Sequence, residues 1–154
     1  MKKALLLTLL SAMMFSFGFS QTADRFWSPN KEVQSNIVKD KGVARLSFPK
    51  EFKLFDLNTE SLRQDLFSIV GNSQKHSTVI SLPNADGNYE QFEVHETSNF
   101  APALQARFPE IRAYTGKGIT DRGAILKLSI SPQGIQTMVF RIEKADEFIE
   151  PYSK

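Results

Sequence analysis

Short runs of alternating apolar and polar residues, separated by turn-forming sequences, dominate the second half of the chain. In the run 124–130, every second residue is aliphatic or alanine and the residues between them are mostly polar. Asp86-Gly87 and the segment 131–134 supply turn formers between such runs, a pattern typical of antiparallel hairpins. The strands predicted in this region span residues 78–82, 89–94, 110–114, 124–130, 135–140 and 147–150.

The first half of the chain contains a different pattern. Residues 59–70 place Leu62, Leu66, Ile69 and Val70 at helical spacing, with Asn58 or Thr59 available as an N-cap and Gly71-Asn72 as a stop. This spacing predicts an amphipathic helix that lies on the sheet. Two strands are predicted before it at 43–48 and 52–57, and the segment 21–42, without clean periodicity, is predicted to be an extended or loosely helical lead-in.

A second, short helix is predicted at about 101–108, capped near Asn99 and ended by Pro109. Together these elements predict an α+β fold, a β-rich antiparallel sheet with one amphipathic helix at about 59–70 and this shorter one. Residues 43–154 are expected to form a single domain, since a chain of this length supports one core. The whole chain has thirteen Phe residues, a single Trp and a steady aliphatic content, which make a core possible without cross-links. It has no Cys, which excludes disulfide staples and cysteine-based zinc or nucleophile chemistry.

The N-terminus has the three parts of a secretory signal peptide. Lys2 and Lys3 precede an uncharged, mostly apolar stretch at 4–19, and small residues before Gln21 fit cleavage between Ser20 and Gln21. A membrane anchor is the alternative, but the apolar stretch is shorter than the roughly 20 residues that a span requires. We therefore expect residues 1–20 to be removed and the rest to be secreted or periplasmic, without a membrane partner.

Removal of the signal peptide changes the charge balance. The chain has 19 basic and 17 acidic residues, so the loss of Lys2 and Lys3 leaves the two kinds equal in number. Basic residues are also scattered, without the stripe that tracks a phosphate backbone. Nucleic acid is therefore not expected as a partner.

The two histidines do not form a recognisable metal or catalytic site. His95-Glu96 begins like the H-E-x-x-H helix of zinc proteases, but Asn99 stands where the second histidine is needed. His95 also falls at the end of a predicted strand, and His76 falls in a polar loop. Both are expected to be ordinary surface or edge residues.

Other groups with chemical potential also lack a supporting pattern. Gly116-Lys117-Gly118 resembles a fragment of a phosphate-binding loop, but no helix follows at the required spacing, so a break in a strand is expected. The acidic pairs Asp146-Glu147 and Glu93 with Glu96 are candidates for a glycosidase dyad or calcium ligands, but neighbouring carboxylates are common on any solvated surface, and that is the expectation for these pairs. No serine lies in a nucleophile-elbow pattern. No catalytic, cofactor or metal site is therefore predicted.

A series of short motifs lies between 80 and 118, with the residues Leu82, Pro83, Asn84, Gly87, Pro102, Leu104, Pro109, Glu110, Tyr114, Gly116 and Gly118. Their order resembles the N-terminal pro-region of secreted bacterial reprolysin-like zinc metalloproteases, which are metzincins. The hairpin at 131–134 and the segment 148–152, together with Trp27 and Phe55, also fit this resemblance, which covers most of the chain after the signal.

The resemblance implies a folding assistant and temporary inhibitor of a protease catalytic domain. That domain carries H-E-x-x-H-x-x-G-x-x-H, which is not found in this sequence, so a fragment or truncated precursor is expected and no enzymatic activity. The partner would then be a metalloprotease catalytic domain, in cis if the chain is truncated. Without Cys, inhibition implies occlusion of the cleft or a zinc ligand other than a thiolate. The alternative is a stand-alone secreted binding or structural module.

Overall fold

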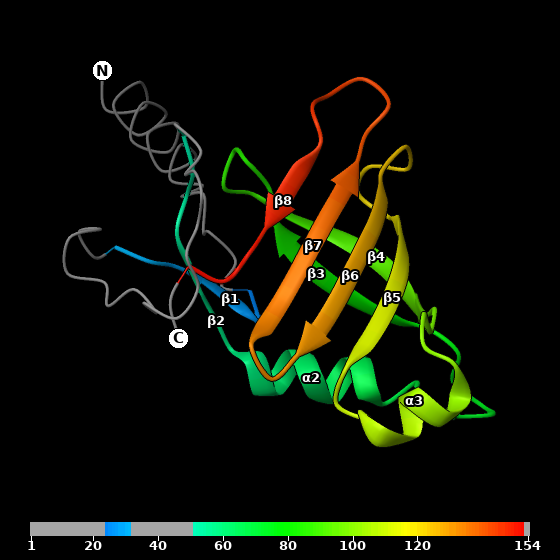
Figure 1. Cartoon of the computed structure of the whole chain (residues 1–154). Coiled ribbons are helices and arrows are strands. Elements are labelled where there is room, and N and C mark those ends of the chain that lie inside the picture. Colours follow the sequence, from blue (N-terminus) through cyan, green and yellow to red (C-terminus); the bar gives the residue numbers. More distant parts are fainter. Residues whose placement is uncertain (1–23, 32–50, 153–154) are drawn as a thin grey trace, which may run out of the picture.

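The computed structural model describes residues 24–31 and 51–152, which form two antiparallel sheets and two helices (Figure 1). A two-stranded ribbon pairs β1 with β2, and a six-stranded sheet contains β3 to β8 in chain order. The elements are β1 (Trp27–Pro29), β2 (Phe55–Leu57), α2 (Thr59–Phe67), β3 (Thr78–Pro83), β4 (Tyr89–Glu96), α3 (Pro102–Arg107), β5 (Arg112–Gly118), β6 (Ile125–Ser131), β7 (Gly134–Phe140) and β8 (Glu147–Ile149). The predicted β-rich α+β fold is confirmed.

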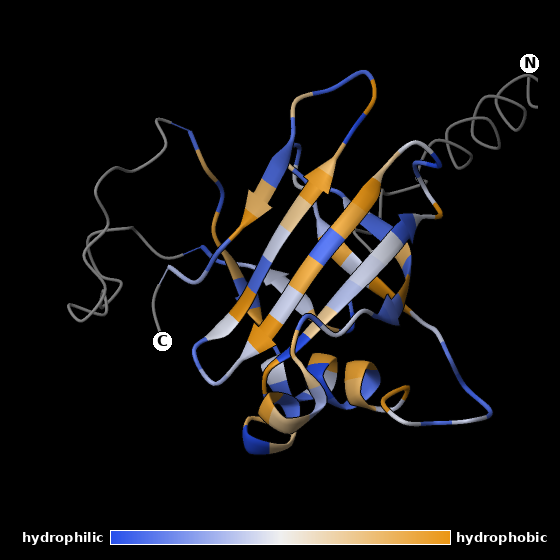
Figure 2. Cartoon of the chain, turned by 45° about the vertical axis from the view of Figure 1, so that its right-hand side comes forward, coloured by the Kyte–Doolittle hydropathy of each residue, from blue (hydrophilic) through white to orange (hydrophobic). Residues whose placement is uncertain are grey.

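The six-stranded sheet is a meander in which each strand pairs with the next one along the chain. Its register brings every second residue of each strand onto one buried face, as the alternation predicts. Figure 2 shows hydrophobic and hydrophilic residues interleaved along these strands. The buried face of the central strands consists of Phe92, Val94, Tyr114, Leu126, Leu128, Ile130, Ile135 and Val139.

Helix α2 covers the buried face at one end of the sheet (Figure 1). Asn58 caps it, since its side-chain oxygen accepts from the backbone N–H of Ser61 at 3.1 Å. Leu62 and Leu66 are fully buried, and the Tyr114 hydroxyl donates to the Leu66 carbonyl at 3.2 Å. This last bond fastens the helix to β5 in the middle of the sheet.

The β1–β2 ribbon closes the core on another side. Phe26 and Trp27 are each only 5% exposed and belong to the same hydrophobic cluster as the sheet and α2. The Trp27 indole N–H donates to the Ser81 carbonyl at 2.9 Å, and the Ser81 hydroxyl donates to Asp24. Residues 24–31 therefore contribute to the core and cover part of β3, although their sequence shows no periodicity.

The predicted strand at 110–114 is wrong in its bounds, and the predicted break at Gly116-Lys117-Gly118 is wrong altogether. Strand β5 begins at Arg112, because Ile111 closes a turn onto the Phe108 carbonyl, and it continues through Gly118. A Cβ on Gly116 would lie 2.8 Å from the Val94 Cγ1 atom, so this glycine makes room for the side chains of neighbouring strands.

Both helices are shorter than predicted. Helix α2 ends at Phe67 and not at residue 70. A turn follows that leads into Gly71 at φ +63°, and Ile69 is buried although it lies in this turn. Helix α3 spans Pro102–Arg107, and the predicted cap near Asn99 is wrong. Ala101 is the N-cap residue and no side chain caps it.

The strand predicted at 52–57 is limited to Phe55–Leu57, because its partner β1 offers only three residues for pairing. The remaining predictions for the N-terminal part lie outside the described residues. These are the signal peptide at 1–20 with its cleavage between Ser20 and Gln21, the strand at 43–48, and most of the lead-in at 21–42.

Candidate functional site

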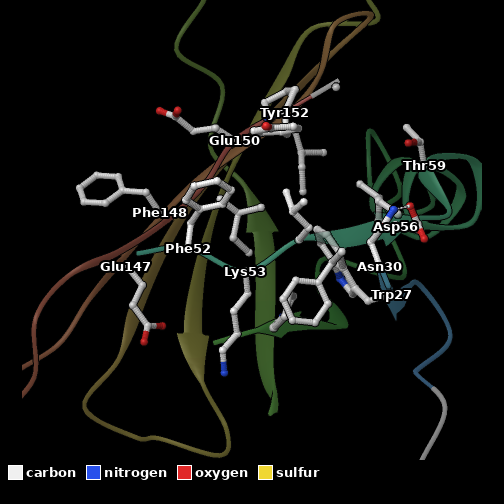
Figure 3. A pocket seen from close by; sticks show the side chains of 18 of the residues that line it. Trp27, Asn30, Phe52, Lys53, Asp56, Thr59, Glu147, Phe148, Glu150 and Tyr152 are labelled. Atoms are coloured by element: carbon white, nitrogen blue, oxygen red, sulfur yellow. Dashed lines mark hydrogen bonds between the residues drawn. The ribbon is translucent and has the colours of Figure 1, made fainter. Parts of the chain in front are cut away.

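A groove of about 1010 Å³ lies between the β1–β2 ribbon and the segment that contains β8. Figure 3 shows Trp27, Asn30 and Asp56 on one side of it, and Glu147 and Phe148 on the other. The β3–β4 turn and the β6–β7 turn supply further walls through Asn84-Ala85 and residues 131–135. Five segments distant in sequence therefore meet at this groove.

Aromatic rings hold the groove wall together. Trp27 and Phe55 meet edge to face with centroids 6.4 Å apart, and Phe55 makes the same kind of contact with Tyr89 at 6.4 Å. Phe52 and Tyr152 lie 5.8 Å apart in a tilted arrangement. Aromatic pairs in these geometries contribute about 0.5–1.5 kcal/mol beyond their burial. The contacts among Trp27, Phe55 and Tyr89 thus hold the ribbon against β4.

Charged groups at the groove are mostly acidic. The described residues that line it include Lys53 and Arg63 as its bases, and Glu51, Asp56, Asp146, Glu147 and Glu150 as its acids. Asp56 accepts from the Asn30 side-chain amide at 2.8 Å. Glu147 accepts from the backbone N–H of Ala85 at 3.2 Å, which ties the β3–β4 turn to β8.

A buried ion cluster lies next to this groove, centred on Arg141. The guanidinium, whose side chain is 2% exposed, contacts Glu90 at 2.7 Å, Glu147 at 2.7 Å and Asp121 at 2.9 Å. Glu90 also accepts from the Asn84 side-chain amide at 2.9 Å. One arginine therefore connects β4, the β5–β6 loop and β8 to the end of β7.

The electrostatics of this cluster favour its charged state. Burial by itself lowers the pKa of Arg141, but its hydrogen bonds to the carboxylates of Glu147 and Glu90 outweigh burial and raise that pKa above the ordinary value. The guanidinium is therefore permanently charged, and three carboxylates surround it. Its Nε atom is buried and has no hydrogen-bond partner among residues 24–31 and 51–152.

The two tyrosines with shifted pKa values belong to the core and its border. Burial raises the pKa of Tyr114, and the nearby Glu96 carboxylate raises it further. Burial and the charge of Asp24 raise the pKa of Tyr89. Both hydroxyls therefore stay protonated at neutral pH and act as hydrogen-bond donors, Tyr114 to α2 and Tyr89 to the Trp27 carbonyl at 3.4 Å.

The histidines and the predicted acidic pairs are not assembled into one site. His76 is exposed in its loop, and His95 lies near the end of β4, opposite Thr115. Glu93 accepts from the Ser77 hydroxyl at 2.8 Å, and Glu96 is paired with Arg112 at 2.8 Å. Of the pair Asp146-Glu147, Glu147 belongs to the Arg141 cluster and Asp146 is exposed.

The motif residues behind the family resemblance occupy structural positions in different parts of the domain. Leu82 and Tyr114 are core residues, and Gly87 takes the left-handed φ of +89° that the β3–β4 turn requires. Asn84 closes that turn by accepting from the N–H of Asn88 and binds Glu90. The remaining ones lie on β3, around α3 and on β5: Pro83, Pro102, Leu104, Pro109, Glu110, Gly116 and Gly118.

Sequence reasoning missed the Arg141 cluster, although a signal for it exists. The buried residues of β7 are Ile135, Thr137 and Val139, and the same alternation makes Arg141 the next inward-facing position. In β4 the alternation of Phe92 and Val94 makes Glu90 inward-facing as well. Two opposite charges at inward positions of a sheet indicate a buried ion pair, because neither is tolerated there alone.

Among the described residues, no group of three or more His, Asp or Glu side chains is placed to hold a metal ion. No helix in the same part of the chain is long and apolar enough to cross a membrane. Comparison of the chain with protein-family models, with curated proteins and with solved structures found no match.

Proposed function

We propose that the chain is an exported, non-catalytic domain that acts as the pro-region of a secreted zinc metalloprotease. In this role it assists the folding of the catalytic domain and covers its cleft until the pro-region is removed. The ordered motifs between 80 and 152 support the proposal, together with their continuation in Trp27 and Phe55. The α+β domain is compatible with a role that depends on surface contact.

The hydrogen bonds that hold the carboxylates around Arg141 support the proposal that the domain is not catalytic. Glu90 and Glu147 lie close together, which is the arrangement that an acid–base pair requires. Both are bound to one buried guanidinium, and Glu90 is held by Asn84 as well. Carboxylates engaged in this way stabilise the fold and are poorly placed to exchange protons with a substrate.

The chain without residues 1–20 provides the direct test. The denatured catalytic domain of a reprolysin-like metalloprotease is refolded with and without this chain, and the folded enzyme is assayed with increasing amounts of it. We expect more recovered activity in the first assay and saturable inhibition in the second. Bovine serum albumin at equal concentration is the control for unspecific protection. A chain that neither assists refolding nor inhibits contradicts the proposal.

A stand-alone secreted binding module is the second candidate, and the exposed apolar side chains on β6 and β8 favour binding in either case. The genomic DNA beyond the codon for Lys154 distinguishes the two. A reading frame with H-E-x-x-H within the next few hundred codons supports a pro-region, whereas a stop codon followed by an unrelated gene favours the module. N-terminal sequencing of the exported protein tests the proposed export, with Gln21 as the expected first residue.

A further inference from the structure

Exposed apolar side chains gather on the outer face of β6, β7 and β8. Ile125 is 48% exposed and is the register partner of Phe140, which is 39% exposed. Phe148 is 61% exposed and is paired with Met138, which lies on the same face of β7 as Phe140. Ile142 follows Phe140 at the same spacing and is 83% exposed. We call these five residues the outer patch.

The outer patch is contiguous across three strands. Directly opposed residues in an antiparallel pair bring their Cβ atoms to about 5 Å, so Ile125 and Phe140 are neighbours, as are Met138 and Phe148. Ile142 leans towards the turn before β6, since its Cδ1 atom lies 3.3 Å from the position of a Cβ on Gly123. A contiguous apolar surface of this kind is typical of an interaction site.

Two lysines border the outer patch on its β5 and β6 side. Lys117 is the register partner of Ile125, and Lys127 is the register partner of Met138. Lys127 donates to the Thr115 hydroxyl at 2.9 Å. In the parts of the chain that the structure describes, neither ammonium group forms an ion pair with a carboxylate. Lys117 also has Glu93 of β4 as its register partner on the same face, so the border charge that a partner can neutralise is that of Lys127.

We propose that the outer patch is the docking surface for the protease catalytic domain, which contacts it with apolar side chains bordered by carboxylates. This inference rests on the proposed function and names the surface through which that function operates. An apolar centre with a charged rim is the usual anatomy of a protein interface. Complementary charge at the rim speeds association and fixes orientation.

Charge and shape favour this occupant over two others. A second copy of the chain, docked by the same face, would bring Lys127 of both copies into one interface, and like charges there oppose association. A lipid surface is less suitable, because only Ile142 and Phe148 of the patch are more than half exposed, whereas Ile125 and Phe140 are more than half covered. Side chains that enter a bilayer need to project from the protein. A partner protein with acidic groups places opposite charges at the border, and it can contact side chains that lie along the sheet.

The test uses two double variants of the chain without residues 1–20. Ile125→Ser with Phe148→Ser removes apolar surface, and Lys117→Glu with Lys127→Glu reverses the border charge. The matched control is Val79→Ser with Lys75→Glu, since Val79 is 47% exposed at the opposite edge of the sheet and Lys75 lies in the loop before β3. Inhibition constants are measured against the folded catalytic domain of a reprolysin-like metalloprotease, and thermal unfolding verifies that every variant is folded.

We expect each patch variant to raise the inhibition constant about tenfold or more, and the control to change it less than about twofold. The effect of the lysine pair is expected to shrink at high salt, because salt screens rim charges. If the unchanged chain inhibits but the patch variants inhibit equally well, the docking surface is wrong and the proposed function remains. If the unchanged chain does not bind the catalytic domain, both are wrong.

Two further measurements identify the other occupants. Analytical ultracentrifugation reports self-association, and sedimentation with vesicles of phosphatidylcholine and phosphatidylglycerol in equal parts reports membrane binding. Self-association that the patch variants abolish, in place of protease binding, overturns the inference in favour of a second copy. Vesicle binding that they abolish overturns it in favour of a lipid surface. The absence of both, with patch-dependent inhibition, supports the inference.

Discussion

Removal of the buried guanidinium is the perturbation for which the structure gives the clearest expectation. Arg141→Met keeps much of the side-chain volume but leaves Glu90, Glu147 and Asp121 without their shared partner. Breaking a buried ion pair from one side costs about 3–5 kcal/mol, because a buried charge remains uncompensated. Glu147 and Asp121 are 24% and 36% exposed and regain water, whereas Glu90 is only 10% exposed. We therefore expect a loss near the lower end, about 3 kcal/mol.

Urea unfolding followed by tryptophan fluorescence measures this loss, since Trp27 is buried in the core. A decrease of about 3 kcal/mol corresponds to a midpoint lower by about 2 M at an ordinary urea dependence. Arg25→Met is the matched control. It removes an arginine that pairs with Asp65 at 2.8 Å but is 63% exposed, and exposed pairs contribute less than about 1 kcal/mol.

A double variant distinguishes the ion cluster from simple packing. Adding Glu90→Gln to Arg141→Met removes the stranded charge and leaves an amide oxygen that accepts from Asn84. We expect the double variant to be more stable than Arg141→Met alone, with a coupling of about 1–3 kcal/mol in the double-mutant cycle. A loss below about 1 kcal/mol for Arg141→Met, or additive losses in the cycle, would refute the importance of this cluster.

Three more substitutions test how the sheet, the ribbon and the helix are joined. Gly116→Ala places a Cβ 2.8 Å from a Val94 methyl, and we expect a stability loss of about 1–3 kcal/mol in urea unfolding. Trp27→Phe removes the indole bond to the Ser81 carbonyl, and we expect faster hydrogen exchange in the β1–β2 ribbon and a loss of about 1 kcal/mol. Tyr114→Phe removes the hydroxyl bond to α2, with a loss of about 1 kcal/mol at neutral pH and a weaker decline of stability above pH 10.

The sign of the last effect follows from proton linkage. Burial raises the pKa of Tyr114 above its unfolded value of 10.0, so the contribution of its protonated hydroxyl is present below that pH and is lost as the pH rises above it. An unchanged alkaline profile in Tyr114→Phe contradicts this reasoning. Unchanged hydrogen exchange in the β1–β2 ribbon of Trp27→Phe contradicts the prediction for that variant. Unchanged stability of Gly116→Ala contradicts the prediction for close packing at Gly116.

The sheet could be predicted from the sequence because its strands follow one another along the chain and each strand buries only one face. Each hairpin brings a strand next to the previous one, so local alternation between Tyr89 and Val94, or between Ala124 and Ile130, is sufficient to give the buried face. Nothing in this inference requires contacts between distant segments. The length of α2 was less predictable, since Ile69 continues the helical spacing and is buried although it lies in a turn after the helix.

Contacts between distant segments explain what the sequence did not predict. Glycine weakens helices and strands, so Gly116 by itself suggests a break. The side chains of Val94 and Leu126, which approach it from the two neighbouring strands, explain why a glycine stands inside β5. Glu90 and Arg141 are 51 residues apart, and each alone suggests an exposed charge. Their pairing depends on a meander that places β4 and the end of β7 at the same end of the domain.

The family resemblance and the docking surface depend on different residues, and this separates fold from function. Leu82, Gly87 and Gly116 carry the motifs, and their burial, backbone conformation and close packing are requirements of the fold itself. Any domain with this fold has reason to keep them, whatever it binds. Lys117 and Ile125 have no such structural requirement, because both are exposed on the outer face. Protease binding by the unchanged chain therefore tests the pro-region role, and the patch variants test separately whether the outer patch is the surface that binds.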